Sequence, residues 1–272
     1  MARLPDDLLA RLDAFLLTLN AAAGEAILPL FRADHGLDDK GGPGAFDPVT
    51  QADRGAEATI RKLIARDFPE HGVIGEEYGR DRDDAEFVWV LDPVDGTRAF
   101  IAGLPLWTTL IGLRWQGRPV LGSIGQSFLG EVFIGSAAGS RRIDRDGSQT
   151  PLKVRACPTL SSAIIATTDP EACFTANERA AWTQLRAATR LARLGCDAYA
   201  YAMVAAGTMD MVVEAGLKCW DIDSAIPLIE GAGGQVVDWR GATVGSEGGQ
   251  IVISGDKALT GPTVEILRQA AT

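Results

Sequence analysis

Two carboxylates and a Gly-Thr pair follow four apolar residues in the run Val88-Trp89-Val90-Leu91-Asp92-Pro93-Val94-Asp95-Gly96-Thr97. We expect residues 88–91 to form a buried strand, at whose mouth Asp92 and Asp95 would repel each other and lose solvation. A hard cation relieves such a pair, and oxygen-only ligands favour Mg²⁺, Mn²⁺ or Ca²⁺. The N–H groups of Gly96 and Thr97 open a helix-like stretch and could hold an anion. Adjoining metal and phosphate sites would suit metal-assisted phosphoryl chemistry.

Two other acidic clusters also adjoin apolar segments, Gly75-Glu76-Glu77 and Trp220-Asp221-Ile222-Asp223. Each has a plain structural alternative, because Glu-Glu pairs are common in solvated loops and Asp-Pro often opens a turn. Asp221 could equally be the N-cap of a helix that begins at Ile222. The combination of three such clusters favours one shared metal site.

The composition limits the classes of partner. A formal net charge of −10 argues against a nucleic-acid backbone or an anionic membrane as the main partner. This charge does not argue against a phosphate substrate, since bound cations invert the local field. Only His35 and His71 are histidines, which leaves little material for a histidine-based metal site or a Ser-His-Asp triad.

The four cysteines are scattered and form no CxxC pair, which indicates reduced thiols and no zinc cluster. Residues 1–29 interleave acidic residues with leucines and lack the basic start and continuous apolar run of a signal peptide. The sequence offers no stretch of about 18 apolar residues for a membrane span. We therefore expect a soluble, cytoplasmic protein.

The elements that must position these clusters follow from hydrophobic spacing and turn residues. In the first half, apolar residues at helical spacing predict helices over 5–31 and 50–68. A short strand is expected at 73–74, and a charged loop at 81–86 leads into the strand at 88–91. Antiparallel strands are predicted at 108–115, 120–127 and 131–134, and the polar stretch 140–150 is a hairpin tip or the approach to a domain boundary.

The second half alternates between strands and helices, which favours layered α/β packing. The predicted strands are 163–166, 190–194, 209–214, 235–238 and 251–254. The predicted helices are 178–188, 198–206, 222–231 and 261–270. Pro227 removes a backbone donor inside the third of these helices, so we expect a kink or an irregular turn there.

Taken in order, Gly75-Glu76-Glu77, Asp92-Pro93-Val94-Asp95-Gly96-Thr97 and Trp220-Asp221 resemble the inositol-monophosphatase-like, Mg²⁺-dependent phosphatases. Upstream, Asp47-Pro48-Val49-Thr50-Gln51-Ala52-Asp53 is similar to the family's stretch that ends in a helix-borne Asp. Downstream, Gly231-Ala232-Gly233-Gly234 is similar to its Gly-rich turn. The resemblance covers nearly the whole chain. It implies an α/β fold, the five-layered α/β/α/β/α sandwich of the inositol monophosphatase and fructose-bisphosphatase type.

The resemblance also implies a set of metal ligands, namely the carboxylates of Glu76, Asp92, Asp95 and Asp221 and the carbonyl of Val94. Asp92 would bridge two metals among the two or three Mg²⁺ expected at the site, with Mn²⁺ as a substitute. Ions in such sites lie roughly 3.5–4 Å apart and can stabilise both the attacking and the leaving oxygen.

Gly96 and Thr97 would hold the phosphate through backbone N–H groups, again by resemblance. The Thr97 hydroxyl, hydrogen-bonded to Asp53, would help to orient and deprotonate a metal-bound water, so that Asp53, Thr97 and Glu76 are the implied catalytic residues. That water would attack phosphorus in line, without a phosphoenzyme. Positioning and charge neutralisation are most of what phosphoryl transfer needs.

Residues 95–107, 197–201 and 226–234 resemble the histidinol-phosphate phosphatase branch more than the inositol branch. Histidinol phosphate carries an ammonium group and an imidazole, which carboxylates beyond those needed by metals would suit. The candidates for these contacts are Glu214, which in the family faces the substrate, and Asp197, which could instead be a helix N-cap. Arg98 could reach phosphate, substrate or a subunit partner, or lie on a solvated helix face.

One motif departs from this branch, because Lys218-Cys219-Trp220-Asp221 stands where Lys-Pro-Tyr-Asp is expected and is closer to the inositol branch. The leading hypothesis is a Mg²⁺-dependent phosphomonoesterase that hydrolyses L-histidinol phosphate in histidine biosynthesis. The alternatives are an inositol-1-phosphate or broad sugar-phosphate phosphatase, and a catalytically idle metal- or phosphate-binding regulator. The family further implies a homodimer. Residues 1–150 are expected to hold most metal and phosphate ligands, and 151–272 the last metal Asp and the substrate-recognition residues.

Overall fold

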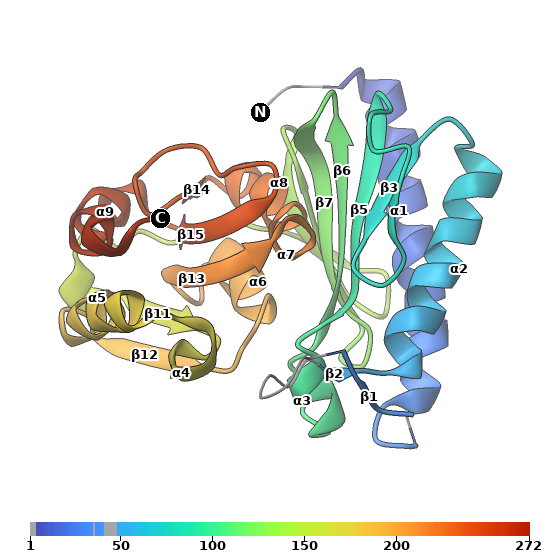
Figure 1. The fold of residues 1–272 in the computed structure, drawn as a ribbon. Coiled ribbons are helices and arrows are strands. Elements are labelled where there is room, and N and C mark those ends of the chain that lie inside the picture. Colours follow the sequence, from blue (N-terminus) through green and yellow to red (C-terminus); the bar gives the residue numbers. More distant parts are fainter. Residues whose placement is uncertain (1–3, 35, 41–47) are drawn as a thin grey trace.

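The computed structural model describes residues 4–34, 36–40 and 48–272. The elements stack in five layers in the order helix, sheet, helix, sheet, helix, which confirms the expected sandwich (Figure 1). One outer layer consists of α1 (Asp6–Ile27) and α2 (Gln51–Asp67). The middle layer holds α6 (Tyr199–Ala205), α7 (Cys219–Ile222) and α8 (Ala225–Gly231). The other outer layer is formed by α5 (Ala176–Ala187) and α9 (Thr260–Leu267).

The sheet beside α1 and α2 has eight strands and is antiparallel except for one pair, in which β3 runs parallel to β5. Because of this exception, the carboxyl ends of β3 and β5 meet at the same edge of the sheet. Its strands in spatial order are β10 (Gln149–Pro151), β9 (Gly139–Ile143), β8 (Glu131–Ser136), β7 (Arg118–Gln126), β6 (Thr108–Trp115), β5 (Phe87–Asp95), β3 (Gly72–Gly75) and β4 (Gly79–Asp81).

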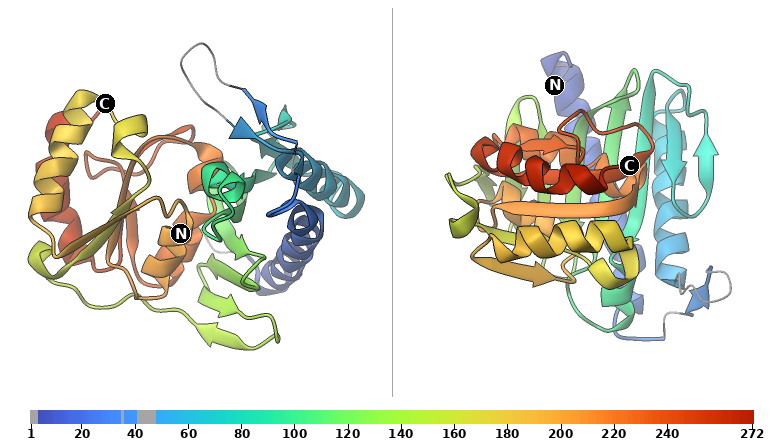
Figure 2. Two further views of the ribbon diagram at one scale, coloured as in Figure 1. Left: turned by 90° about the horizontal axis from the view of Figure 1, so that it is seen from below. Right: turned by 60° about the vertical axis from the view of Figure 1, so that its left-hand side comes forward.

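The second sheet has five strands, with β12 and β11 parallel to β13 and with β15 antiparallel to its neighbours. In spatial order they are β12 (Leu191–Leu194), β11 (Ile164–Thr167), β13 (Met211–Lys218), β15 (Gly248–Ser254) and β14 (Gln235–Val237). A separate pair, β1 (Asp38–Asp39) and β2 (Pro48–Val49), precedes α2. The short helix α3 (Thr97–Ile101) lies at the junction of the two halves in the view from below (Figure 2, left), and α4 (Pro170–Cys173) follows β11.

Three clusters of apolar side chains fill the four spaces between helix and sheet layers. Residues such as Leu16, Ile60 and Trp89 pack α1 and α2 onto the large sheet. A second cluster joins α6 and α8 to both sheets, and a third packs α5 and α9 onto the outer face of the small sheet. These cores hold the two sheets in fixed positions, so that side chains at their edges can form one site.

Helix α1 combines an acidic first turn with a buried stripe that includes Leu12, Leu16, Leu19 and Ile27. By length and hydropathy alone, the stretch Asp6–Leu30 also reaches the level of a membrane span, with a mean hydropathy of 1.2. The expectation that no part of the chain does so is therefore wrong. In this fold 44% of an 18-residue window within that stretch is buried, and the buried stripe of α1 packs against α2 and the large sheet.

The helix predicted over 222–231 begins only at Ala225, because the chain turns at Asp223 and Ser224 after the separate helix α7. Pro227 therefore falls in the first turn of α8, where a backbone donor has no helical acceptor and its absence costs nothing. Helix α8 continues through Pro227 to Gly231. The irregular turn that we expected lies three residues earlier.

Other boundaries differ in smaller ways. The charged segment 81–86 is a loop except for Asp81, the last residue of β4, which pairs with β3 in a hairpin, and β15 starts at Gly248 instead of Ile251. The polar stretch 140–150 is a hairpin between β9 and β10, one of the two forms that we expected. The division of the chain into parts at residue 150 stays a prediction, although the large sheet ends at Pro151 and the small sheet begins at Ile164.

Candidate active site

The parallel pair of strands brings the first two acidic clusters together. Gly75, the last residue of β3, pairs with Leu91 of β5, and the amide of Glu76 donates a hydrogen bond of 3.2 Å to the carbonyl of Leu91. Glu76 and Asp92 thus follow directly on paired positions of neighbouring strands. Their side chains line the same cavity, which has a volume of about 280 Å³.

Strand β5 continues past the predicted end at Leu91 and reaches Asp95 by means of a bulge. Asp92 pairs with Leu110 and Asp95 with Thr108, so β5 contains one more residue than its partner between these points. Pro93 lies inside the bulge, where a missing N–H leaves no ladder bond unmade. Because of the extra residue, both Asp92 and Asp95 line the cavity.

Asp221 joins them from the helical middle layer, just after β13 of the small sheet. It is the third residue of α7, and its Oδ2 accepts a hydrogen bond of 2.7 Å from the backbone N–H of Lys218. The alternative that Asp221 caps a helix starting at Ile222 is therefore wrong, since the helix begins at Cys219. Carboxylate oxygens of Asp92, Asp95 and Asp221 all lie within 4.8 Å of one another.

Burial and the proximity of other acids raise the pKa values of these carboxylates. Loss of solvation, with repulsion from neighbouring acids, raises the pKa of Asp92 and of Asp95 well above the usual aspartate range. Burial raises the pKa of Asp221 to about 6, against the opposing hydrogen bond from Lys218. Three acids that resist losing their protons, with only oxygen ligands between them, have the character of a site for a hard divalent cation.

Glu76 stands at the rim of this group and has a cationic neighbour. The Lys40 ammonium lies 3.2 Å from Oε1 of Glu76 and 2.8 Å from Oε1 of Glu77. Burial raises the pKa of Glu76 to about 7, although the charge of Lys40 opposes the rise. For Lys40 itself, burial lowers the pKa, but the hydrogen bond to Glu77 and the two glutamate charges outweigh burial and raise it.

The second acid of the third cluster, Asp223, is not part of the site. It is buried against the guanidinium of Arg114, which donates through Nε and Nη2 and also reaches the carbonyl of Ser246. This ion pair packs α7 against β6. Asp223 therefore has a structural role beside Asp221.

The Gly96-Thr97 turn lies next to the acids and begins α3. Gly96 has a φ of 78°, and a Cβ there would lie 3.2 Å from the carboxyl group of Asp197, so both backbone conformation and space favour glycine. The Thr97 hydroxyl lies 3.1 Å from the Val94 carbonyl and 3.5 Å from Oδ1 of Asp53. Since a hydroxyl donates one proton, Val94 is the better-placed acceptor here and Asp53 the more distant one.

Asp53 is held firmly by the turn before α2. Its Oδ2 accepts hydrogen bonds from the backbone N–H and the hydroxyl of Thr50, at 2.7 and 2.6 Å. Burial raises its pKa, against these two hydrogen bonds. Asp47, at the start of the motif that contains Asp53, lies outside the described residues, as does His35.

Two further carboxylates line the other side of the cavity. Glu214 on β13 is 2% exposed and accepts hydrogen bonds from the Thr167 hydroxyl and from the N–H and hydroxyl of Thr168. Burial raises the pKa of Glu214 to about 8. Burial also raises the pKa of Asp197 to about 6, against the charge of Arg98.

Asp197 does not cap a helix, contrary to the structural alternative. It adopts a φ of 45°, and the residue at the N-cap of α6 is Ala198, without a side-chain cap. Arg98 lines the cavity and lies 3.4 Å from Asp169 at the start of α4, with half of its side chain exposed. It therefore bridges the two halves of the chain and does not simply face solvent.

All predicted site residues except Asp53 line this one cavity, and Asp53 contacts it through Thr97. The individual roles assigned to them stay predictions.

The family model for the inositol monophosphatase family matches residues 8–271. The chain belongs to the inositol monophosphatase family. It is 41% identical over 235 residues to the bifunctional phosphatase IMPL2, chloroplastic, of Arabidopsis thaliana, a match covering 85% of this chain and 66% of that protein. It is 35% identical over 194 residues to a histidinol-phosphatase of Chlorobaculum parvum, covering 71% of this chain and 73% of the relative. An inositol monophosphatase structure from Zymomonas mobilis superposes with a TM-score of 0.84 at 36% identity, covering 96% and 98% of the two chains.

Membership of a phosphatase family that depends on metals agrees with the acidic group described above. Several residues at the site were not predicted from the sequence. Lys40 and Thr168 belong to no motif, and the resemblance of residues 197–201 assigned no role to Tyr201. Glu57 contacts the turn after β3. It lies within the predicted helix 50–68, where its position does not distinguish it from the other polar residues.

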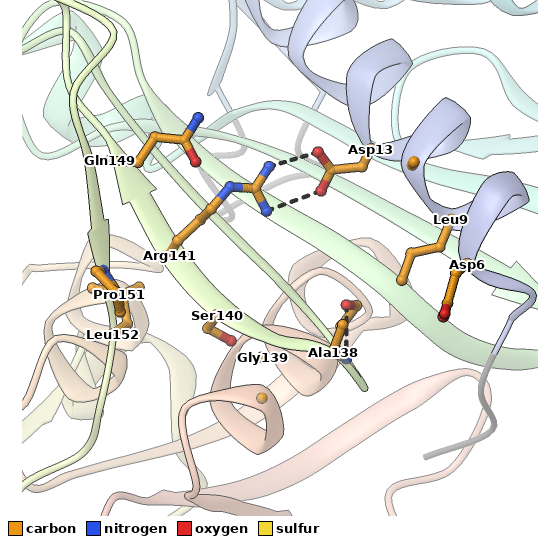
Figure 3. A pocket seen from close by; sticks show the side chains of 13 residues that line it. Asp6, Leu9, Asp13, Ala138, Gly139, Ser140, Arg141, Gln149, Pro151 and Leu152 are labelled. Carbon is orange, nitrogen blue, oxygen red and sulfur yellow. Dashed lines mark hydrogen bonds and ion pairs between the residues drawn. The ribbon is translucent and has the colours of Figure 1, made fainter.

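Larger cavities exist elsewhere in this family member. One of about 770 Å³ lies between α1, β9 and β10, where Arg141 forms a bidentate pair with Asp13 (Figure 3). Within the described residues, the group of acids close enough to share a cation is the one formed by Asp92, Asp95 and Asp221. Chemistry, and not volume, therefore identifies the candidate active site.

Proposed function

We propose that this member of the inositol monophosphatase family is a Mg²⁺-dependent phosphomonoesterase whose preferred substrate is L-histidinol phosphate. The observation that carries the proposal is the presence of two kinds of carboxylate in one cavity of about 280 Å³. Asp92, Asp95 and Asp221 crowd together as a cation site requires, whereas Glu214 and Asp197 line the same cavity without belonging to that group.

The residues fit a divalent metal. Their ligand atoms are all oxygens, and their raised pKa values reflect burial without a compensating protein cation at Asp92 and Asp95. Asp92, Asp95, Asp221, Glu76 and the Val94 carbonyl would hold two or three Mg²⁺, with Mn²⁺ as a substitute. When bound, such ions neutralise phosphate charge and lower the pKa of a coordinated water.

The chain's own groups would do the remaining work. The N–H groups of Gly96 and Thr97 would orient the phosphate, and Thr97 Oγ1 would hold the attacking water in line with phosphorus. Its hydroxyl has two acceptors within reach, Val94 O at 3.1 Å and Asp53 Oδ1 at 3.5 Å. A proton taken up at Thr97 Oγ1 could therefore pass towards Asp53, whose raised pKa suits it to receive one.

The substrate's cation supports the choice of histidinol phosphate. Glu214 is buried with a pKa of about 8 and would become a stable anion on meeting an ammonium or imidazolium group. Asp197 adds a second carboxylate, and Tyr201, whose pKa burial raises well above its ordinary value, would remain a neutral hydrogen-bond donor beside them. The relative from Chlorobaculum parvum is named a histidinol-phosphatase, which favours the same substrate.

An inositol-1-phosphate or broad sugar-phosphate phosphatase is the second candidate. The sequence Lys218-Cys219-Trp220-Asp221 favours it, as does the structural neighbour from Zymomonas mobilis. A catalytically idle regulator would be expected to have lost a metal ligand or the Thr97–Asp53 pair, and the chain retains both.

Phosphate release from a substrate panel tests the proposal. The panel contains histidinol phosphate, inositol 1-phosphate, fructose 1,6-bisphosphate and adenosine 3′,5′-bisphosphate, each assayed with Mg²⁺ and with EDTA. Histidinol phosphate should rank among the best by kcat/KM. A different preference would contradict the substrate, and full activity in EDTA would contradict the metal.

We also propose that the protein acts as a homodimer, on the basis of the family resemblance, and that it is cytoplasmic, on the basis of its scattered cysteines. Its net charge of −10 supports a small phosphorylated metabolite as partner over nucleic acid or an anionic membrane. Light scattering coupled to gel filtration would measure the mass, and a monomer at micromolar concentration would contradict the dimer.

A further inference from the structure

The hairpin turn that carries Glu76 closes around a carboxylate from another element, that of Glu57 on α2. Glu57 Oε2 accepts a hydrogen bond of 2.8 Å from the N–H of Glu77, and Oε1 accepts one of 3.2 Å from the N–H of Tyr78. The Glu57 side chain is 0% exposed. Successive backbone N–H groups around an anion form a nest, and here the anion belongs to the protein.

Two further contacts complete this arrangement, and we call the contacts of Glu57 and Arg61 with the turn after β3 the Glu57 clamp. Arg61, one turn along α2, donates through Nε to Glu57 Oε1 at 2.7 Å and through Nη2 to the carbonyl of Gly79 at the far side of the turn. At the near side, a Cβ on Gly75 would overlap the Glu57 carboxylate, so the backbone of Gly75 packs directly against it. Glu57 and Arg61 thus contact the turn at both ends and in its middle.

Glu76 lies between these fixed points. Its own amide is bound to the carbonyl of Leu91, its neighbour Glu77 is bound to Glu57, and Gly75 is packed against the same carboxylate. A buried carboxylate is costly unless hydrogen bonds satisfy it. Any displacement of the turn would break the hydrogen bonds to Glu57, leave its buried carboxylate without donors and so cost free energy. The backbone on both sides of Glu76, which lines the cavity, is thereby held in place from α2.

We propose that Glu57 is a positioning residue that preorganises Glu76 as a metal ligand and so sets the affinity of the site for divalent metal. This inference rests on the proposed metal-dependent function. Groups that orient metal ligands through hydrogen bonds change metal affinity by about 10- to 100-fold when they are altered. Glu57 acts on its ligand through backbone amides, and it touches neither metal nor substrate.

Glu57→Gln tests the inference. The substitution keeps the size of the side chain but replaces one of the two oxygens, which accept hydrogen bonds from Arg61 and from the N–H groups of Glu77 and Tyr78, with an NH₂ group that cannot accept them. We expect the dissociation constant for Mn²⁺, measured by calorimetry on metal-free protein, to rise at least tenfold. At saturating Mg²⁺, kcat should return to within about threefold of the parent value, and KM for the phosphoester should be unchanged. Glu178→Gln, the same change at a buried carboxylate on α5, should leave the Mn²⁺ constant unchanged.

Amide hydrogen exchange of the metal-free protein measures directly how firmly Glu57 holds the turn. Glu77 and Tyr78 should exchange faster in Glu57→Gln than in the parent. Arg61→Met loosens the same clamp from its more exposed end and should give a smaller rise in the Mn²⁺ constant, which keeps the test open if Glu57→Gln does not fold. Parent-like Mn²⁺ affinity in folded variants would overturn the positioning role, whereas a parent protein that binds no Mn²⁺ would overturn the proposed function as well.

Discussion

Oδ2 of Asp95 accepts a hydrogen bond of 2.8 Å from the backbone N–H of Ala198. Asp95 belongs to β5 of the large sheet, whereas Ala198 leads into α6 beside the small sheet. This bond fixes the cation-binding group relative to Asp197, the residue just before Ala198. If the proposed substrate binds, this contact between the two halves of the chain would set the distance between its phosphate and its cationic group.

Asp92→Asn should abolish phosphate release and weaken metal binding while it leaves the fold intact. Burial and the neighbouring acids raise the pKa of Asp92, so folding without metal carries the cost of keeping this acid protonated, and a neutral amide removes that cost. The melting temperature without metal should hold or rise, and the increase that Mg²⁺ gives the parent protein should disappear. Thermal unfolding with and without Mg²⁺ measures both effects.

Asp210→Asn is the matched control, since Asp210 is buried but bound bidentately by Arg155. Removing one partner of such a pair leaves the other uncompensated, so this variant should melt at a lower temperature. It should nevertheless keep the stabilisation by Mg²⁺. Undiminished turnover in Asp92→Asn would exclude the proposed metal-dependent mechanism.

Thr97→Val should lower kcat by about 100-fold, in line with the loss of a positioned proton-transfer group. Valine has the shape of threonine but cannot bond Val94 O or Asp53. Because Thr97 is assigned to the reaction and not to the metal, the Mn²⁺ dissociation constant should stay within about twofold of the parent. Thr97→Ser keeps the hydroxyl and should retain most of the activity. Equal kcat values for the Val and Ser variants would show that the hydroxyl has no catalytic part.

The acidic clusters were predictable from the sequence because each stands at the end of an apolar segment. The parallel pairing of β3 and β5 turns this one-dimensional pattern into the proximity of Glu76 and Asp92. The five layers were inferred by resemblance, whereas the alternation of helices and strands pointed only to layered packing. Local spacing placed most elements correctly, apart from their ends.

What the sequence did not reveal depends on contacts between distant residues. The Glu57 clamp joins α2 to a turn 20 residues away, and the Lys40 ion pairs span 36 and 37 residues. No periodicity records such pairings. The end of β5 was misplaced for a related reason, since Asp-Pro normally opens a turn and only pairing with β6 converts it into a bulge.

Lys40→Gln should tighten Mn²⁺ binding by about fivefold, which corresponds to the roughly 1 kcal/mol of a partly exposed ion pair. The Lys40 ammonium lies 3.2 Å from Glu76, where its positive charge repels an incoming divalent cation. Calorimetric titration of metal-free protein measures the change. Lys62→Gln, which removes the same charge from an exposed position on α2, should have no effect. Weaker binding in Lys40→Gln would mean that the ammonium supports the site.

Glu214→Gln should remove part of the loss of stability that the metal-free protein undergoes as the pH rises. Burial raises the pKa of Glu214 from 4.5 to about 8, so between these values the folded protein keeps a proton that the unfolded chain has released. The free energy of unfolding therefore falls with rising pH across this window, by roughly 1.4 kcal/mol for each unit of pKa shift. The stability that depends on protonated Glu214 is fully present below pH 4.5, and the free energy of unfolding changes no further from this cause above about pH 8.

Urea unfolding in EDTA at pH 5, 7 and 9 would show this effect as a smaller fall in the free energy of unfolding for Glu214→Gln than for the parent. The other buried acids remain in both proteins, so their contributions cancel in the comparison. Glu178→Gln is the control, because hydrogen bonds from Thr175 and Gln250 outweigh burial and lower the pKa of Glu178. Its pH effect lies below 4.5 and leaves the higher range unchanged. Parallel curves for Glu214→Gln and the parent from pH 5 to 9 would mean that Glu214 is already ionised in the folded protein, and that its charge is stabilised before any substrate arrives.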